Sequence, residues 1–335
     1  MKRRLCSVLL SVVVAASMLA GCGSTETAPA AETSTAPAAE EVTEAPAEEA
    51  APEETAAAES YKVYLITMDQ MDQHWVNVDA GCKKAADELG NVEYKWLAPD
   101  VKDDAKQIEC INNAVADNAD AILLAANGPD AVTAALEEAV AAGVKIIYVD
   151  SAADFEGEVT FATDNQAAGK TAGDEMLKAL TDKGITSGKI GVVNVNAATA
   201  SCVARETGFR SAFEGSDFEI LETQYSEGDA AKSKDIAANY ITSGCVGIFG
   251  ANEGSTTGVG NAIQEAGDDV VGVGFDKSDT ILSLIKDGYL LATMAQNPDV
   301  MGYEGLKAAV AVLGGESFGG AVTDTGVSVI TKEGL

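Results

Sequence analysis

Short apolar runs alternate with helical patterns from Tyr61 onward, and this alternation limits the possible folds more than any other feature. Between the runs, apolar residues recur every three or four positions, as at Ile108, Ile111 and Val115. Alternation with nearly continuous apolar strands predicts an α/β fold with parallel sheets covered by helices on both faces. The predicted strands are YKVYLITM, NVEYKWL, ADAILLAA, VKIIYVD, EVTFATD, KIGVVNV, FEILETQY, VGIFGA, DVVGVGFD and YLLATMAQ.

Two breaks in this alternation predict two lobes that the chain enters more than once. After VKIIYVD, a loop and the short strand EVTFATD take the place of a helix, and a new helix opens at Asn165. We place one crossover at Ala162–Asp164 and a second at Ala295–Asn297, before a helix beginning near Asp299. The predicted N-terminal lobe is 60–163 plus 296–323, and the C-terminal lobe is 164–295 plus 324–335.

The first 22 residues have the pattern of a lipoprotein signal peptide. Lys2, Arg3 and Arg4 precede an apolar stretch that is shorter than the about 20 residues of a membrane span. The stretch ends in LAGC, which resembles a bacterial lipobox with Cys22 as the lipidated residue. This predicts an extracytoplasmic protein anchored to the cell membrane, on the outer face of a Gram-positive membrane or in a periplasm. The alternative is an ordinary secretory peptide with a chance cysteine.

Residues 23–59 are rich in Ala, Glu, Thr and Pro and have almost no large apolar side chains. Such a segment cannot bury enough surface to fold, so we predict a disordered acidic linker. The formal net charge of the whole chain is −31, which argues against a nucleic-acid-binding surface.

Four cysteines remain beyond the signal and Cys22, namely Cys82, Cys110, Cys202 and Cys245. They are widely spaced and allow three disulfide connectivities, but a large core does not need such crosslinks. Free, mostly buried thiols are therefore favoured. The chain has one histidine and no zinc-ligand spacing, so no metal site is predicted.

Polar residues follow the predicted strands in both halves of the chain. In open parallel sheets, ligands bind beyond the carboxyl ends of the strands. Carboxylates, amides and an aromatic face meeting there suit a neutral, polyhydroxylated ligand, although each Asp or Asn alone is also a common helix N-cap. The candidates are Asp72, His74, Trp75, Asp150, Ser151, Asn252, Asp276 and Gln296.

Enzyme motifs fail on their context. The GKT at Gly169–Thr171 lacks the glycine that a phosphate loop needs five residues before Gly169, since Asp164 stands there. The glycines of GVG at Gly258–Gly260 lie within a helical pattern, and no G-x-S-x-G is present. His74 has no evident nucleophile partner. The sequence predicts a binding protein with no catalytic residue and no cofactor.

Four segments resemble the ribose-type periplasmic binding proteins, the substrate-binding subunits of sugar ABC importers. They are FATDNQAAGKTAGDEM, GIFGANEG, VVGVGFD and LLATMAQNPDVMGYEGL, and the resemblance runs from Tyr61 to about Ile330. It implies two Rossmann-like lobes joined by three hinge strands that close on a monosaccharide. By position, His74 and Trp75 would be aromatic stackers, with Asp72 as a further contact in the same loop. Asp150, Asn252, Asp276 and Gln296 would bind hydroxyls.

The chain also departs from that family. Ribose binders have Arg where Ser151 stands, their other ligand-binding Arg aligns with Val203, and a third aromatic stacker aligns with Gly228. Arg205 would be a structural residue adjacent to the ligand. Because guanidinium groups fix which hydroxyls are recognised, these departures disfavour ribose. They leave room for a different or larger sugar, a polyol or a furanosyl signal molecule.

The resemblance predicts a monomeric, lipid-anchored subunit that delivers a monosaccharide or polyol to an ABC permease and its ATPase. The alternative is a sensory binding protein that reports its ligand to a membrane receptor. Neighbouring genes for a permease and an ATPase would favour import.

Overall fold

The computed structural model describes residues 60–267 and 269–335. The predicted signal peptide (1–22), lipidation at Cys22 and linker (23–59) lie outside the described residues. Within the described part, the strands form two sheets, and we call the elements around them the first and the second lobe.

The first lobe contains a six-stranded, wholly parallel sheet in the order β12-β5-β4-β3-β1-β2. Its strands are β1 (Tyr61–Ile66), β2 (Val92–Leu97), β3 (Ala121–Leu124), β4 (Lys145–Val149), β5 (Val159–Ala162) and β12 (Ala321–Asp324). Helices α1 (Gln73–Leu89) and α9 (Pro298–Leu313) pack on one face of this sheet, and α2 (Asp104–Ala116) and α3 (Thr133–Ala141) on the other.

The second lobe contains a seven-stranded sheet in the order β13-β11-β10-β9-β6-β7, with β8 paired to β6. Its strands are β6 (Ser187–Asn194), β7 (Asp217–Ile220), β8 (Gln224–Tyr225), β9 (Cys245–Gly250), β10 (Val271–Phe275), β11 (Ala292–Gln296) and β13 (Val327–Thr331). Helices α4 (Asn165–Asp182) and α5 (Ala200–Ser211) cover one face. Helices α6 (Ala230–Thr242), α7 (Glu253–Ala266) and α8 (Asp279–Asp287) cover the other. A short 3-10 helix, η1 (Lys332–Gly334), follows β13.

Three details differ from the sequence prediction. The predicted strands include neither β12 nor β13, which follow α9. The run FEILETQY contains two strands, β7 and β8, because the chain leaves the sheet between Ile220 and Gln224. The strand β13 pairs antiparallel with β11, so the second sheet is not wholly parallel. The chain passes from β12 to β13 directly through Thr325 and Gly326, with no helix between them, so β13 enters the second sheet from the carboxyl ends of its parallel strands and runs against β11.

The chain passes between the sheets three times. It leaves the first lobe between β5 and α4, returns between β11 and α9, and leaves again between β12 and β13. Local contacts fix these passages. Asp164 caps α4 by accepting a 3.0 Å hydrogen bond from the backbone of Ala167, and Asn297 donates a 2.8 Å bond to the carbonyl of Thr325.

Helices α1 and α9 approach each other closely because glycines face the contact. A Cβ added at Gly81 would lie 2.1 Å from the carbonyl oxygen of Asp299, and one at Gly302 would lie 2.0 Å from that of Val78. Only glycine fits at such separations. This packing holds α9, which follows the second lobe in the sequence, against the first.

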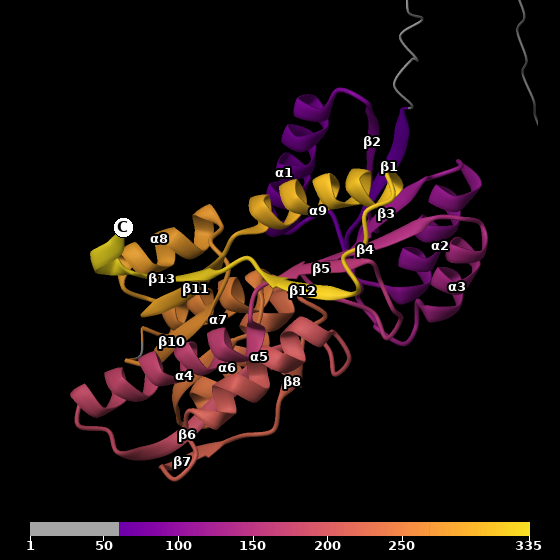
Figure 1. Ribbon diagram of the computed structural model, residues 1–335. Coiled ribbons are helices and arrows are strands. Elements are labelled where there is room, and N and C mark those ends of the chain that lie inside the picture. Colours follow the sequence, from indigo (N-terminus) through magenta and orange to yellow (C-terminus); the bar gives the residue numbers. More distant parts are fainter. Residues whose placement is uncertain (1–59, 268) are drawn as a thin grey trace, which may run out of the picture. The chain divides into compact units, whose positions relative to one another are not determined.

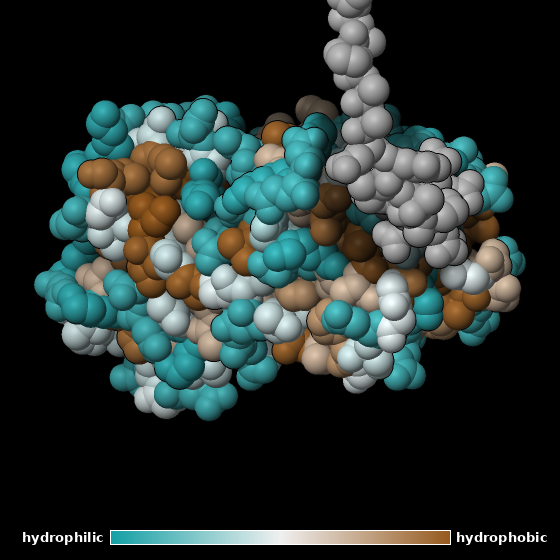
Figure 2. All heavy atoms as spheres, turned by 45° about the horizontal axis from the view of Figure 1, so that its top comes forward, coloured by the Kyte–Doolittle hydropathy of each residue, from teal (hydrophilic) through white to brown (hydrophobic). Residues whose placement is uncertain are grey.

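The four cysteines of the described residues are free, as the sequence predicted, and Cys82, Cys202 and Cys245 are buried. On the face shown in Figure 2, hydrophilic residues surround separate groups of hydrophobic ones. Among residues 60–267 and 269–335, no helix has both the length and the apolar character needed to cross a membrane.

Candidate ligand-binding site

A small cavity, nearly filled by the side chains around it, lies where the carboxyl ends of the strands of both sheets meet. It is lined by seven of the residues predicted to bind ligand, and by Arg205. Ser151 does not line it, but lies beside it, since its hydroxyl accepts a 3.3 Å hydrogen bond from the backbone of Ser201. The lining residues are Met68, Asp72, His74, Trp75, Lys102, Asp150, Val195, Ser201, Cys202, Arg205, Asn252, Asp276 and Gln296.

Asp150 and Asp276 occupy equivalent places in the two lobes. Asp150 directly follows β4 and Asp276 directly follows β10, and both have left-handed backbone conformations, with φ of 65° and 75°. Non-glycine residues rarely adopt this conformation, and it costs roughly 1–2 kcal/mol. Both side chains are buried at the cavity. Each lobe thus places one carboxylate at the cavity, and in each case the residue has a strained backbone conformation at the end of a strand.

Gln296 and Thr293, both on β11, hold Asp276 in place. The Gln296 amide donates a 2.6 Å hydrogen bond to Asp276 Oδ1, and the Thr293 hydroxyl donates a 2.7 Å bond to the Asp276 carbonyl. Gln296 Oε1 is left with no hydrogen-bond partner in the described part of the chain, although it is buried. Gln296 thus orients a carboxylate and presents an acceptor to a bound molecule.

His74 lies between the two aspartates. Its Nε2 is 3.0 Å from Asp150 Oδ2, and its Nδ1 is 3.5 Å from Asp276 Oδ1. The Nε2 contact is close but poorly aligned, so it is an ion pair rather than a directed hydrogen bond. Burial lowers the pKa of His74, but Asp276 and Asp150 outweigh it and raise the pKa to about 10. Burial raises the pKa of Asp276, and the imidazolium brings it down to about 2.

The ring of His74 also lines the cavity. The sequence predicts that this ring forms a wall against the ligand, as Trp75 does, and donates a hydrogen bond to it. The rings of His74 and Trp75 meet edge to face, with centroids 4.7 Å apart and planes at 83°. Trp75 lines the cavity, and its buried Nε1 has no partner among the described residues. The cavity wall thus contains the ring of His74, flanked by two carboxylates, and the indole of Trp75 beside it.

Arg205 lines the cavity from α5. Its Nε donates a 2.7 Å bond to Asn165, its Nη1 donates a 3.0 Å bond to the carbonyl of Ala251, and its guanidinium lies 4.3 Å from the centroid of Phe275. The third nitrogen, Nη2, has no hydrogen-bond partner in the described residues and is 3.7 Å from Asp150 Oδ2. Arg205 thus combines a structural role with a free donor at the cavity.

Lys102 is a lining residue that sequence reasoning missed. It follows β2, and its side chain is 5% exposed and forms ion pairs with Asp69 and, at 2.8 Å, with Asp72. Burial lowers the pKa of Lys102, but Asp72 and Asp69 raise it above the ordinary value. A lysine after a short strand carries no special signal. The only sequence cue was the excess of carboxylates at Asp69 and Asp72, which needed a partner.

Asn252 performs the capping role that a residue of its type commonly has. Its Oδ1 accepts a 3.0 Å hydrogen bond from the backbone of Ser255 in the first turn of α7. Its Nδ2 lies near Gly228, where an added Cβ would be 3.1 Å from that nitrogen and 2.9 Å from Lys102 Nζ. Gly228 also has a φ of 73°. A larger side chain at Gly228 would therefore crowd the cavity.

The two lobes are joined beside the cavity by direct hydrogen bonds. The Thr199 hydroxyl donates a 2.7 Å bond to the carbonyl of Asn127, and Glu253 accepts bonds of 2.9 and 3.0 Å from the backbone nitrogens of Gln73 and His74. These contacts define a closed arrangement in which the cavity is enclosed from both sides.

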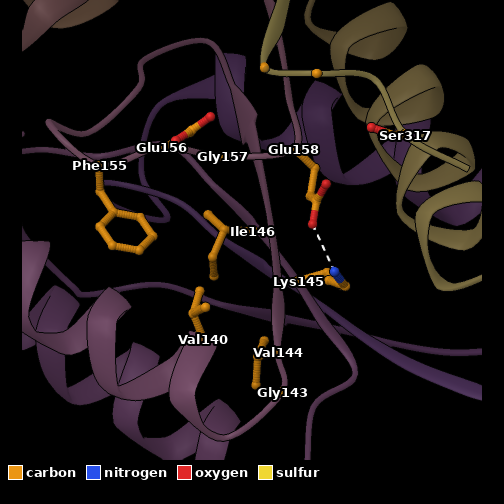
Figure 3. Close-up of a pocket in the computed structure, with 12 residues that line it drawn as sticks. Val140, Gly143, Val144, Lys145, Ile146, Phe155, Glu156, Gly157, Glu158 and Ser317 are labelled. Atoms are coloured by element: carbon orange, nitrogen blue, oxygen red, sulfur yellow. Dashed lines mark hydrogen bonds and ion pairs between the residues drawn. The ribbon is translucent and has the colours of Figure 1, made fainter. Parts of the chain in front are cut away.

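A second hollow of about 690 Å³ lies at the opposite edge of the first sheet, where β4 and β5 begin. Figure 3 shows Phe155 and Ile146 beside it, with Lys145 paired to Glu158. That ion pair is 2.9 Å long and half-exposed, so its charges satisfy each other. In the described ranges, no group of His, Cys, Asp or Glu side chains is arranged to hold a metal ion. The enclosed cavity between the lobes is therefore the candidate site.

Two α/β lobes that enclose a polar cavity between their strand ends define a two-lobed ligand-binding protein. Residues 63–317 match the family model described as "Periplasmic binding protein domain". The chain belongs to this family, and its fold is that of the type I periplasmic binding proteins.

Curated relatives are sugar-binding transport proteins. The chain is 30% identical over 271 residues to the ribose import binding protein RbsB of Haemophilus influenzae, covering 80% of this chain and 90% of the relative. It is 26% identical to the D-allose-binding periplasmic protein of Escherichia coli, covering 76% and 84%.

Solved structures are similar over most of the chain. A carbohydrate transporter solute-binding protein of Agrobacterium radiobacter in complex with D-arabinose has a TM-score of 0.78 and 31% identity, covering 83% of this chain and 96% of that one. An ABC transporter solute-binding protein of Agrobacterium vitis bound to α-D-tagatopyranose has a TM-score of 0.77 and 28% identity, covering 82% and 95%.

Proposed function

We propose that the protein is the extracytoplasmic substrate-binding subunit of a sugar ABC importer. It encloses one monosaccharide or related polyol between its lobes and presents it to a membrane permease. The relatives that carry this proposal bind ribose, allose, arabinose or tagatose. Lipid attachment at Cys22 would keep the protein beside its permease.

One observation supports sugar binding most directly. Besides His74 Nε2, which is ion-paired with Asp150, three buried polar atoms at the cavity have no hydrogen-bond partner in the described part of the chain: Trp75 Nε1, Arg205 Nη2 and Gln296 Oε1. Each such atom costs roughly 1–3 kcal/mol when it stays unpaired, so a bound molecule that pairs them is favoured. Two donors and one acceptor, held around the indole of Trp75, suit a ring that carries several hydroxyls.

Ribose itself is not the sugar we expect, since Ser151 and Gly228 stand where the ribose-type pattern has an arginine and an aromatic ring. The third departure, Val203, does not bear on the ligand as the sequence suggested, because Val203 is 40% exposed and outside the cavity lining, where Arg205 supplies a guanidinium. The test is a thermal-shift screen of the purified protein against D-ribose, D-allose, D-arabinose, D-tagatose, D-fucose and common polyols. Binding raises the unfolding temperature by mass action. We expect at least one of these compounds to stabilise the protein, and stabilisation by none would contradict the proposal.

Import and sensing are separated by a second experiment. A strain from which this gene is deleted should lose uptake of the radiolabelled sugar found in the screen, and should regain it with the wild-type gene. Substitution Cys22→Ala tests the anchor. We expect the variant protein to leave the membrane fraction, and retention there would contradict lipid attachment. Normal uptake without the gene would favour the sensory alternative.

A further inference from the structure

We propose that His74 is a protonated clasp between the lobes. Its imidazolium holds Asp150 of the first lobe and Asp276 of the second, so closing the lobes takes up a proton and leaves a cavity suited to an uncharged ligand. The part of this inference that concerns the ligand rests on the proposed function. The part that concerns the proton does not.

The geometry requires the charged form. Both nitrogens of His74 face a carboxylate oxygen, at 3.0 Å from Asp150 and 3.5 Å from Asp276. A neutral imidazole has a single N–H, so one nitrogen would direct its lone pair at a carboxylate. The imidazolium has a proton on both nitrogens, and its positive charge attracts both carboxylates even though the Nε2 contact with Asp150 is not a directed hydrogen bond. The His74 side chain is 5% exposed, so water does not screen this contact appreciably.

Asp150 and Asp276 raise the pKa of His74 more than the other charged groups around it change that pKa. The backbone nitrogen of His74 donates to Glu253 on α7, and Lys277 lines a small hollow that His74 and Glu253 also line. Asp72 ends the loop before α1, where Lys102 neutralises it, and Arg205 approaches Asp150 from α5. The net effect of these surroundings is the raised pKa of about 10 for His74.

Closing the lobes raises the pKa of His74. His74 and Asp150 belong to the first lobe, whereas Asp276 belongs to the second and reaches the ring only when the lobes meet. The arrival of Asp276 raises the pKa of His74. The favourable effect of the clasp is thus complete below the pKa of the open form and is lost as the pH rises to about 10. Between these limits, closing takes up a proton.

The clasp also balances the charge of the cavity. The acidic residues at its wall are Asp72, Asp150 and Asp276, and the basic ones are His74, Lys102 and Arg205. With His74 protonated, the charges of these lining residues cancel; Asp69, which shares Lys102 with Asp72, lies outside the lining. An ammonium or phosphate group on the ligand would be buried without a counter-charge, which is strongly unfavourable. Removing the His74 charge would leave one carboxylate in excess and favour a sugar that carries an amine.

The first test uses the fact that His74 is the chain's only histidine. In the full chain, labelled at histidine with ¹⁵N and purified without a histidine tag, NMR reports the protonation of this ring alone. We expect a titration midpoint well above 6.5, and a lower midpoint in Asp276→Asn. Asp174→Asn, an exposed ion-paired position on α4, is the matched control and should leave the midpoint unchanged. A wild-type midpoint near 6.5, or no change in Asp276→Asn, would overturn the clasp.

The second test concerns the ligand. Calorimetry at pH 7 compares D-galactose with D-galactosamine, and D-glucose with D-glucosamine, in the wild type and in His74→Gln. We expect the wild type to prefer the neutral sugar, and the variant to shift the ratio of affinities by about tenfold or more toward the amine. An unchanged ratio would overturn the charge-balance argument. If no sugar in this or the earlier screen binds, the proposed function fails with the charge-balance argument, and the NMR titration alone decides the clasp.

Discussion

Glu253 Oε2 of the second lobe lies 3.0 Å from the backbone nitrogen of His74 in the first. Its other oxygen accepts a 2.9 Å bond from the backbone of Gln73. These two N–H groups belong to the first turn of α1, where helices lack internal partners. The N-cap residue Asp72 makes no side-chain cap, because its carboxylate binds Lys102. Closing the lobes therefore supplies the cap that α1 lacks, and it fixes the helix end that carries His74 and Trp75.

We expect Glu253 to make sugar affinity depend on pH below 7. Burial, then Asp72 and Asp276, raise the pKa of Glu253 from 4.5 to about 7 in the closed arrangement. A raised carboxyl pKa means that the closed form binds the proton more tightly. Affinity should thus rise as the pH falls from about 7 toward 4.5, by at most about tenfold per pH unit for one proton.

Calorimetry with the sugar identified in the screen, between pH 5 and 8, measures this slope. Glu253→Gln should flatten it below pH 7, while the dependence due to His74 at higher pH remains. Glu265→Gln, at an exposed ion pair with Lys234 at the end of the same helix, is the control. A slope that persists unchanged in Glu253→Gln would rule out this source.

Lys102→Met should destabilise the protein by roughly 3–5 kcal/mol, because it leaves Asp69 and Asp72 buried near each other without a cation. Urea unfolding measures the loss. The double variant Lys102→Met/Asp72→Asn should recover part of it, since one of the uncompensated charges is gone. Lys106→Met, at an exposed pair with Asp100, should change the stability by less than about 1 kcal/mol. Equal losses of stability in Lys102→Met and Lys106→Met would contradict the view that burial makes the Lys102 ion pairs more important than the exposed one.

Gly81→Ala should force α1 and α9 apart, because the new methyl group would lie 2.1 Å from the Asp299 carbonyl oxygen. Overpacking of this kind costs typically about 1–3 kcal/mol, and more when backbone must move. Thermal unfolding gives the size of the effect. Gly334→Ala, where an added Cβ meets nothing within 4 Å, is the control. An unchanged midpoint for Gly81→Ala would show that the helices can separate without cost.

The thiols should react with iodoacetamide in a defined order. Burial raises the pKa of Cys202 and of Cys245 to about 11, so both stay protonated and shielded at pH 8. Cys82 is buried, and burial raises its pKa as well, whereas Cys110 is only partly buried. We expect mass spectrometry of the folded protein to find Cys110 modified first among these four. Faster modification of any of the other three would contradict the packing described for them.

The strand pattern and the site region could be predicted from sequence because each depends on local signals. Continuous β-branched runs predict buried strands. Polar residues that directly follow such strands are predicted to lie together at the carboxyl edge of the sheet. The sequence thus identified Asp150, Asp276 and Gln296, which the structure brings to one cavity. The antiparallel β13 and the split of FEILETQY could not be predicted. Both depend on where the chain enters or leaves a sheet, and apolar periodicity does not show this.

The role of His74 and the presence of Lys102 depend on tertiary placement. Nothing near His74 in the sequence shows that Asp150 and Asp276, which follow it by 76 and 202 positions, will face its two nitrogens. The same holds for Glu253, which reaches α1 from the other lobe. Charge pairing across lobes leaves no periodic pattern, so only the folded arrangement reveals it.

The order of the elements has a consequence for synthesis. The first sheet ends with β12 and is covered by α9, yet both are made only after nearly all of the second lobe, and β13 completes the second sheet at the very end of the chain. Neither lobe can therefore finish folding until the segment from α9 to β13 has been made. Contacts this distant in sequence form slowly. This order of synthesis delays the folding of both lobes. A chain that is exported through a translocation channel must stay unfolded until it has passed, and such a delay would help it to do so.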